Sequence, residues 1–357
     1  MQGADTAVVR QALESGNALP GTTGFAGELD GVLVRDVLGR FPLFSEADAP
    51  TKSSIDPTDL EDPNPVPAGH RRDHTGDERV WSLPRPDPFP TLHQAVSAVR
   101  STLLKSIDGV ASDPPVAFSG GVDSSIVAAR FDGPLYVGGF EGSHDVEAAL
   151  SSADALDRSG DLRIVEFEHK DLERAVPRIV TATGRSNPMD VAIAIPLYLV
   201  AERVATDGHG RLALGQGADE LFGGYAKVAK APDDPRLEAS TIRGATREVV
   251  ATLPWQLERD VLVLRAAGVE PVLPLLHDRV VSSALRLDDE QLVRGAERKV
   301  ALRRAVDFLP DAARKREKKA VQYGSLVSRE LDRLARQAGF KRRMDDHVGR
   351  YIDSLCS

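Results

Sequence analysis

The sequence has 357 residues, with 45 basic and 54 acidic side chains and a formal net charge of −9. Its length allows a large core and about two domains, and its mildly acidic balance does not favour a nucleic-acid partner. The only cysteine, Cys356, excludes an intrachain disulfide framework and a multi-cysteine metal site. No stretch resembles a signal peptide or a membrane-spanning helix, so we expect a cytoplasmic protein without a membrane partner.

Residues 1–90 predict a β hairpin followed by a linker. Residues 31–36 and 41–44 have the pattern of two short strands joined by a turn. Residues 46–90 are rich in proline, aspartate and other charged side chains, and such a stretch buries too little apolar surface to order itself well. We therefore predict a boundary near residue 90 and a main domain over residues 91–357.

From residue 92 onward, a helical pattern over 92–107 is followed by alternating strands and helices. This alternation predicts a parallel sheet covered on both faces, in a doubly wound α/β arrangement with a helical C-terminal part. The predicted strands are 116–118, 135–139, 162–167 and 212–214, and the later predicted helices are 124–131, 145–156, 172–183, 193–205, 257–267, 279–287, 298–308 and 331–343. Ligands bind outside the carboxyl ends of such strands.

A glycine- and serine-rich segment follows the first predicted strand. Its residues are Ser119, Gly120, Gly121, Val122, Asp123, Ser124 and Ser125. Glycines let the backbone approach a ligand, and the following helix presents its positive end to an anion. The hydroxyls suit phosphate oxygens, and Asp123 fits beside a phosphate when Mg²⁺ lies between them. The structural alternative is a glycine turn with an ordinary helix cap.

A second glycine-rich segment, residues 215–225, follows the fourth predicted strand. Its glycines flank the acidic pair Asp219 and Glu220, and Asp219 could share with Asp123 the task of holding Mg²⁺. The alternative is a turn whose acidic residues begin a helix.

The first segment resembles the PP-loop of ATP pyrophosphatases, and the second resembles the corresponding segment of asparagine synthetases. Further stretches similar to that family lie between residues 81 and 324, including 142–145, 196–199, 268–276, 299–303 and 316–319. The resemblance implies the PP-loop ATP pyrophosphatase fold (adenine nucleotide α hydrolase-like), with ATP and Mg²⁺. It implies a nucleotide site at Phe118, Ser119, Gly120, Gly121, Asp123, Ser124, Ser125, Val137, Gly215, Gln216 and Gly217, Mg²⁺ ligands Asp123 and Asp219, and catalytic residues Lys318, Asp123, Asp219 and Glu220.

The implied reaction is an AMP-forming amidation of a carboxylate through an acyl-adenylate, with aspartate as the default acid and ammonia as the nitrogen donor. Four positions depart from the family pattern, and one of them is Val272, which replaces an arginine. Gln216 replaces a glutamate thought to deprotonate ammonia, and an amide is no general base. Ala192 replaces an arginine, which puts the acceptor acid in question. His277 replaces an aspartate, and a capping histidine is the interpretation we favour over a new base.

Residues 34–44 resemble a hairpin of the family's glutaminase domain, whose cysteine nucleophile has no counterpart near the start of this chain. We expect no glutaminase activity. A separate ammonia-supplying subunit and a homodimer stay open as partners. Two alternatives also stay open: adenylation of another small acid or an RNA base, and a nucleotide-binding regulatory subunit without catalysis.

Overall fold

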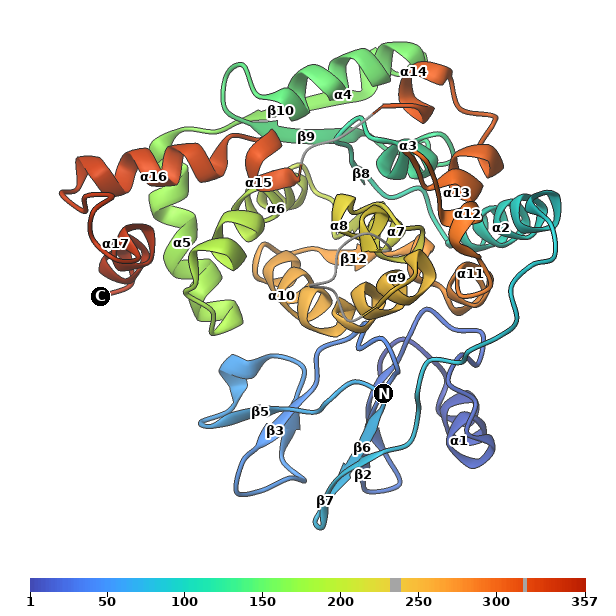
Figure 1. Cartoon of the computed structure of the whole chain (residues 1–357). Helices are drawn as coiled ribbons and strands as arrows, with labels where there is room; N and C mark the ends of the chain where they lie inside the picture. The colour runs from blue at the N-terminus through green and yellow to red at the C-terminus, as the bar shows by residue number, and fades with distance from the viewer. Residues whose placement is uncertain (232–238, 317–319) are drawn as a thin grey trace. The chain divides into compact units, whose positions relative to one another are not determined.

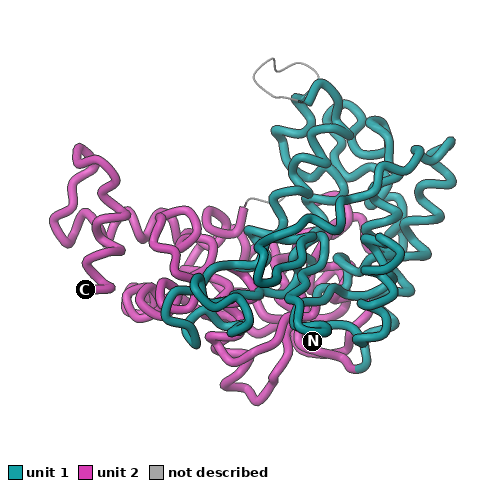
Figure 2. The backbone as a smooth tube through the Cα atoms, turned by 90° about the horizontal axis from the view of Figure 1, so that it is seen from below, with its two compact units in different colours: residues 1–111, 215–258, 273–308 teal, residues 112–214, 259–272, 309–357 magenta. Residues whose placement is uncertain are grey.

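The structure is a computed structural model that describes residues 1–231, 239–316 and 320–357. By its internal contacts the chain divides into two units, each built from three separate stretches of sequence (Figure 2). Unit 1 comprises residues 1–111, 215–258 and 273–308, and unit 2 comprises residues 112–214, 259–272 and 309–357. The domain boundary that the sequence predicts near residue 90 stays a prediction.

Unit 2 contains a parallel sheet of five strands in the order β10-β9-β8-β11-β12. The strands are β8 (Val116–Ala117), β9 (Leu135–Gly139), β10 (Leu162–Glu166), β11 (Arg211–Ala213) and β12 (Glu270–Val272). Every residue of β9 is buried, because α4 (His144–Ala155) and α6 (Pro188–Thr206) cover its two faces (Figure 1). The predicted α/β class with a parallel sheet is therefore confirmed.

The strand order reverses between β8 and β11. Sheet growth runs from β8 through β9 to β10, and the chain then returns to the other side of β8 to add β11 and β12. Such a reversal leaves a crevice at the carboxyl ends of the two strands, where open α/β sheets bind their ligands. The first glycine-rich segment follows β8 directly and thus lies at this switch point.

Helix α6 explains the apolar stretch that the sequence shows after Pro188. Val191, Ala192, Ala194 and Ile195 are all buried, and α6 packs against α5 (His169–Thr183) and the sheet. The other helices of unit 2 are α3 (Val122–Ala128), η2 (Ser159–Asp161), α14 (Asp311–Arg314), α15 (Val321–Gly324), α16 (Val327–Gln337) and α17 (His347–Leu355). The division of the sequence between residues 258 and 259 falls within α10 (Leu253–Ala266). No helix within the described ranges combines the length and apolarity of a membrane span.

The amino-terminal residues of unit 1 form two small antiparallel sheets. The first has the order β1-β2-β6-β7 and the second the order β4-β3-β5. These strands are β1 (Ala26–Leu29), β2 (Val32–Arg35), β3 (Phe44–Glu46), β4 (Ser53–Ser54), β5 (Pro63–Pro65), β6 (His70–Asp73) and β7 (Gly76–Arg79). The predicted hairpin is wrong, because β2 pairs with β1 and β6 while β3 joins the other sheet.

Strands thus run through the stretch that we expected to be a linker, and a buried arginine is the physical reason. The guanidinium of Arg72 donates to Ser45 Oγ at 3.0 Å and to the carbonyls of Asn64 and Pro65 at 2.9 and 3.1 Å. It also pairs with Asp77 at 2.6 Å. The hydrogen bonds of the Arg72 guanidinium therefore hold these strands in place, although the low apolar content of the stretch predicted no ordered structure.

The remaining elements of unit 1 are mainly helical. They are α1 (Thr6–Ser15), η1 (Pro57–Asp59), α2 (Leu92–Ile107), α7 (Ala218–Leu221), α8 (Ala226–Ala229), α9 (Ile242–Ala251), η4 (Pro274–Leu276), α11 (Asp278–Ala284), α12 (Asp289–Leu292), β13 (Val293–Arg294), β14 (Glu297–Arg298) and α13 (Val300–Ala305). Helix α2 has the predicted bounds, and its buried face packs against α11 and α13.

A buried ion cluster ties the amino-terminal sheet to a distant stretch of unit 1. Arg40 Nε lies 2.9 Å from Asp36 Oδ1 and Arg40 Nη1 lies 2.7 Å from Asp278 Oδ1, with all three side chains at most 1% exposed. Asp278 Oδ2 accepts the backbone N–H groups of Gly21 and Thr22 at 3.0 and 2.8 Å. Removing one member of such a cluster leaves its partners charged and buried.

We expect Arg40→Ala to lower the free energy of unfolding by about 3–5 kcal/mol, because Asp36 and Asp278 would lose their counterion inside the protein. Urea unfolding followed by circular dichroism measures this loss. The control is Arg10→Ala, whose ion pair with Asp30 is 45% and 67% exposed and should cost less than about 1 kcal/mol. Equal losses in the two variants would contradict the role given to Arg40.

Candidate active site

The loop after β8 is pressed against helix α4 at Gly120. The backbone of Gly120 is left-handed, with φ 72°, and a Cβ atom there would lie 2.4 Å from the carbonyl oxygen of Ala148. Ser152 of α4 donates its hydroxyl to the carbonyl of Gly120 at 2.8 Å. Only glycine fits this position without a backbone shift.

The serines of the segment gather where the loop enters α3. Ser124 Oγ lies 3.4 Å from Ser119 Oγ and donates to the carbonyl of Gly121 at 3.2 Å. The side chain of Ser125 is fully buried, and its hydroxyl has no hydrogen-bond partner among the residues that the structure describes. A buried hydroxyl without a partner costs about 1–3 kcal/mol, so an oxygen-rich ligand would satisfy a group that the fold itself leaves unsatisfied.

Three further residues predicted for the nucleotide site, Phe118, Val137 and Asp123, differ in how far they are buried. Phe118 and Val137 are buried within the sheet, where Phe118 N donates to the carbonyl of Tyr136 at 2.7 Å. Asp123 is only partly buried, in the first turn of α3. Ser119, Gly120 and Gly121 form the loop after β8, and Ser124 and Ser125 lie in α3. Phe118 directly precedes the loop, and Val137 lies in β9.

The second glycine-rich segment lies in unit 1 and is shaped around the carboxylate of Asp219. A Cβ atom on Gly224 would lie 2.0 Å from Asp219 Oδ1, so glycine lets this carboxylate fold back against the loop. Gly217 has φ 92° and is the N-cap of α7, while Gly215 and Gln216 are partly buried just before it. The predicted residues of this segment thus form one compact turn.

Lys299, the residue before α13, contacts this turn and was not part of our sequence-based site. Its ammonium lies 2.7 Å from Asp219 Oδ1, its side chain is 6% exposed, and its backbone is left-handed with φ 58°. A non-glycine residue held in that conformation is uncommon and marks a constrained position. The sequence offered one signal, since Lys299 opens a stretch similar to the family, but nothing local connected it with Asp219.

Glu220 differs from its neighbour because it is buried and paired with a hydroxyl. Burial raises the pKa of its carboxyl, the hydroxyl of Tyr225 opposes that rise, and the Asp219 carboxylate adds to it. The Tyr225 hydroxyl donates to Glu220 Oε1 at 2.6 Å. A carboxylate with a raised pKa is a stronger base than an ordinary one.

Two predictions cannot be followed further in the structure. Lys318 lies outside the described residues. Asp123 belongs to unit 2 and Asp219 to unit 1, so their shared Mg²⁺ site stays a prediction. Across residues 1–231, 239–316 and 320–357, no group of three or more histidine, cysteine or acidic side chains is arranged to hold a metal.

His277 caps helix α11. Its Nδ1 accepts the backbone N–H of Arg279 at 3.2 Å. Burial lowers the pKa of His277 from 6.5 to about 4, and the charges of Arg279 and Arg40 lower it further while Asp278 opposes them. A neutral capping imidazole agrees with the structural role that we favoured.

We expect stability to fall as the pH drops from about 6.5 to 4, because His277 takes up a proton in the unfolded chain before it does so in the folded one. His277→Asn keeps a capping acceptor without a titrating ring and should remove about 1–2 kcal/mol of this loss, after a discount for solvent screening. Thermal unfolding across this range measures the slope. The exposed His74→Asn is the control, and a slope that both variants leave unchanged would contradict the assignment.

The sequence is similar to known proteins of one family. The sequence matches the Asparagine synthase family over residues 98–253 and 234–353. A Methanocaldococcus jannaschii protein, provisionally described as a glutamine-hydrolyzing asparagine synthetase, is 28% identical over 295 residues, which cover 72% of this chain and 53% of that protein. Asparagine synthetase B of Escherichia coli is 26% identical, over 60% of this chain and 42% of its own length. Asparagine synthetase 1 of Arabidopsis thaliana is 28% identical, over 54% and 35%.

The chain thus spans about half or less of the length of these curated relatives. The family match itself extends from the helix before β8 to the last helix of the chain, and it includes both glycine-rich segments. The chain therefore belongs to the asparagine synthase family.

Proposed function

We propose that the chain is an ATP-dependent, AMP-forming ligase of the PP-loop type, which activates a carboxylate as an acyl-adenylate and amidates it with ammonia. The unsatisfied hydroxyl of Ser125 carries this proposal. It is fully buried, and its loop lies at the switch point of a parallel sheet, where a phosphate chain would supply the missing acceptor oxygens.

The residues divide by role. The loop from Ser119 to Ser125 would bind the phosphates, with Phe118 and Val137 beside it, and Gly215, Gln216 and Gly217 would complete the nucleotide site. Mg²⁺ held by Asp123 and Asp219 would offset phosphate charge. Lys299 would orient the Asp219 carboxylate, with which it pairs at 2.7 Å. The role of Lys318 stays a prediction from the family resemblance.

Glu220 is the residue that we propose as the base for the incoming ammonia. Gln216 cannot accept that proton, whereas burial raises the pKa of Glu220 and so strengthens it as a base. The hydroxyl of Tyr225 donates to one carboxylate oxygen at 2.6 Å and so fixes the orientation of this carboxylate.

Aspartate stays the default acceptor, and another small acid is the alternative. Ala192 and its apolar neighbours in α6 are buried, so core packing explains why this stretch of the sequence is apolar. Asp190, the one charged residue in the sequence from 189 to 195, pairs with Arg259 at 2.7 Å. The apolar stretch is therefore no evidence for an apolar acceptor.

Free ammonia is the proposed nitrogen source, and we place the reaction in the cytoplasm. The single thiol, Cys356, follows α17 directly, and partial burial of its sulfur together with the Asp353 charge raises its pKa. A thiol with a raised pKa forms less of the thiolate that glutamine hydrolysis needs.

Ser125→Ala separates a ligand role from a structural one. Removing a buried hydroxyl without a partner should leave the stability of the free protein unchanged or higher, yet weaken ATP binding at least about tenfold. Calorimetry with ATP and thermal unfolding without it measure the two effects. Ser106→Ala is the control, because its buried hydroxyl donates to the carbonyl of Pro274 at 2.5 Å and its loss should destabilise the protein. Unchanged ATP affinity in Ser125→Ala would remove the main support for the site.

The proposed reaction is tested by pyrophosphate release from ATP and Mg²⁺ with a panel of small acids, with and without ammonium. We expect release with aspartate and ammonium, no stimulation by glutamine alone, and a loss of at least about a hundredfold in Asp123→Ala. Release with a different acid would keep the ligase and change its acceptor. Silence across the panel, despite measurable ATP binding, would sink the ligase and favour a regulatory subunit.

A further inference from the structure

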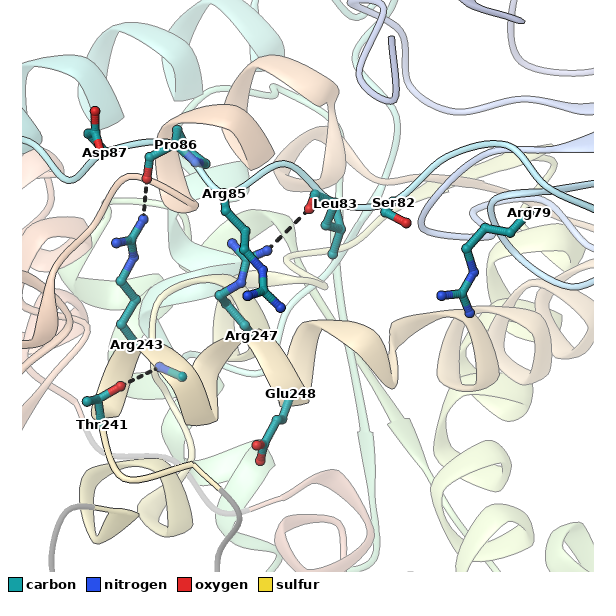
Figure 3. Close-up of a pocket in the computed structure, with 11 residues that line it drawn as sticks. Arg79, Ser82, Leu83, Arg85, Pro86, Asp87, Thr241, Arg243, Arg247 and Glu248 are labelled. Atoms are coloured by element: carbon teal, nitrogen blue, oxygen red, sulfur yellow. Dashed lines mark hydrogen bonds between the residues drawn. The ribbon is translucent and has the colours of Figure 1, made fainter. Parts of the chain in front are cut away.

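A cavity of about 690 Å³ in unit 1 is lined by four arginines. Arg79 and Arg85 come from the amino-terminal part of the chain, and Arg243 and Arg247 come from helix α9 (Figure 3). None of these residues belongs to the proposed active site. Four guanidinium groups around one cavity are unusual in a chain whose net charge is −9, so the cluster needs its own explanation.

Two of the arginines are fixed by backbone carbonyls. Arg247 donates to the carbonyls of Pro84 and Leu83 at 3.0 and 3.3 Å, and Arg243 donates to the carbonyls of Pro86 and Leu285. These bonds hold residues 83–86 against α9 and orient both guanidinium planes before any ligand arrives. Arg243 Nε is nevertheless buried without a hydrogen-bond partner in the described part of the chain.

Arg79 and Arg85 do not hold a backbone segment in this way. Within the described ranges, the side chains of Arg79 and Arg85 make no hydrogen bond or ion pair. Burial lowers the pKa of Arg247, and the charges of Arg85 and Arg243 lower it further, which shows that like charges face one another here. A purely structural clamp would need Arg243 and Arg247 but would gain nothing from Arg79 and Arg85.

The acidic residues of the lining do not neutralise the cluster. Asp87 and Glu248 are the two carboxylates of the cavity wall, and neither forms an ion pair with an arginine among the described residues. Figure 3 shows the carboxylate of Glu248 directed away from the guanidinium of Arg247. The cavity is therefore left with uncompensated positive charge.

We propose that this cavity binds a small phosphate-bearing anion. Several guanidinium groups can each offer paired N–H donors to phosphate oxygens, and the volume lies within the range of small-molecule sites. The positive end of α9, a helix of ten residues, adds to the potential at Thr241, although Thr241 Oγ1 and Asp289 Oδ1 already accept its first N–H groups. The guanidinium groups therefore bind the anion, with Arg79 and Arg85 closing on it.

Inorganic pyrophosphate is the probe, because it carries phosphate chemistry without a nucleoside. Hydrogen exchange of the full chain is measured with and without it, and slower exchange is expected in peptides covering residues 79–87 and 241–248. Calorimetry should show affinity at least about tenfold weaker in Arg79→Ala/Arg85→Ala. Arg10→Ala/Arg294→Ala is the matched control, since it removes two exposed arginines of surface ion pairs elsewhere in unit 1.

Each outcome decides the proposal. Protection of residues 79–87 and 241–248 by pyrophosphate supports it, and equal protection by ATP would show that the phosphates of a nucleotide are also accepted. Protection confined to residues 119–125, unchanged affinity in Arg79→Ala/Arg85→Ala, or equal binding of citrate would overturn it. Because the peptides and variants differ from those of the active site, failure here leaves the proposed ligase untouched.

Discussion

The guanidinium of Arg40 lies enclosed between two carboxylates, and unit 1 can bury it only when distant stretches of the chain meet around it. Asp36 comes from the same turn, whereas Asp278 and the carbonyl of Leu276 come from a segment 236 residues or more further along the chain. A buried charge without its partners is strongly destabilising. Residues 1–90 are therefore an integral part of this unit, whatever their origin within the family.

The parallel sheet of unit 2 imposes a second constraint. Parallel strands place their connections at opposite ends, so a loop that follows a buried strand emerges at the carboxyl edge, where helices on both faces leave a crevice. Gly120 shows how tightly that loop is seated against α4. The same packing buries Ser125 without a hydrogen-bond partner among the residues that the structure describes, and such an unsatisfied hydroxyl costs the free protein some stability.

Helices and strands with a regular apolar spacing could be predicted from the sequence, whereas contacts between side chains distant in the sequence could not. Helix α2 and strand β9 agree with their predicted bounds, because their apolar spacing reports burial directly. The strands between residues 44 and 79 escaped prediction since Arg72 organises them by hydrogen bonding. The role of the serines stays a prediction from their type and order in the sequence, whereas the pairing of Lys299 with Asp219 joins residues that no local pattern connects.

The sequence separation around Arg40 also has a consequence for how the protein is made. A ribosome adds about 5–20 residues per second, so Arg40 waits on the order of ten to fifty seconds before Leu276 and Asp278 follow it into the growing chain. Asp36 is then its only nearby carboxylate of the cluster. Unit 1 can therefore complete its core only after residue 278 has been synthesised, and contacts this distant in sequence form slowly. The amino-terminal sheets depend during that interval on local bonds such as those of Arg72.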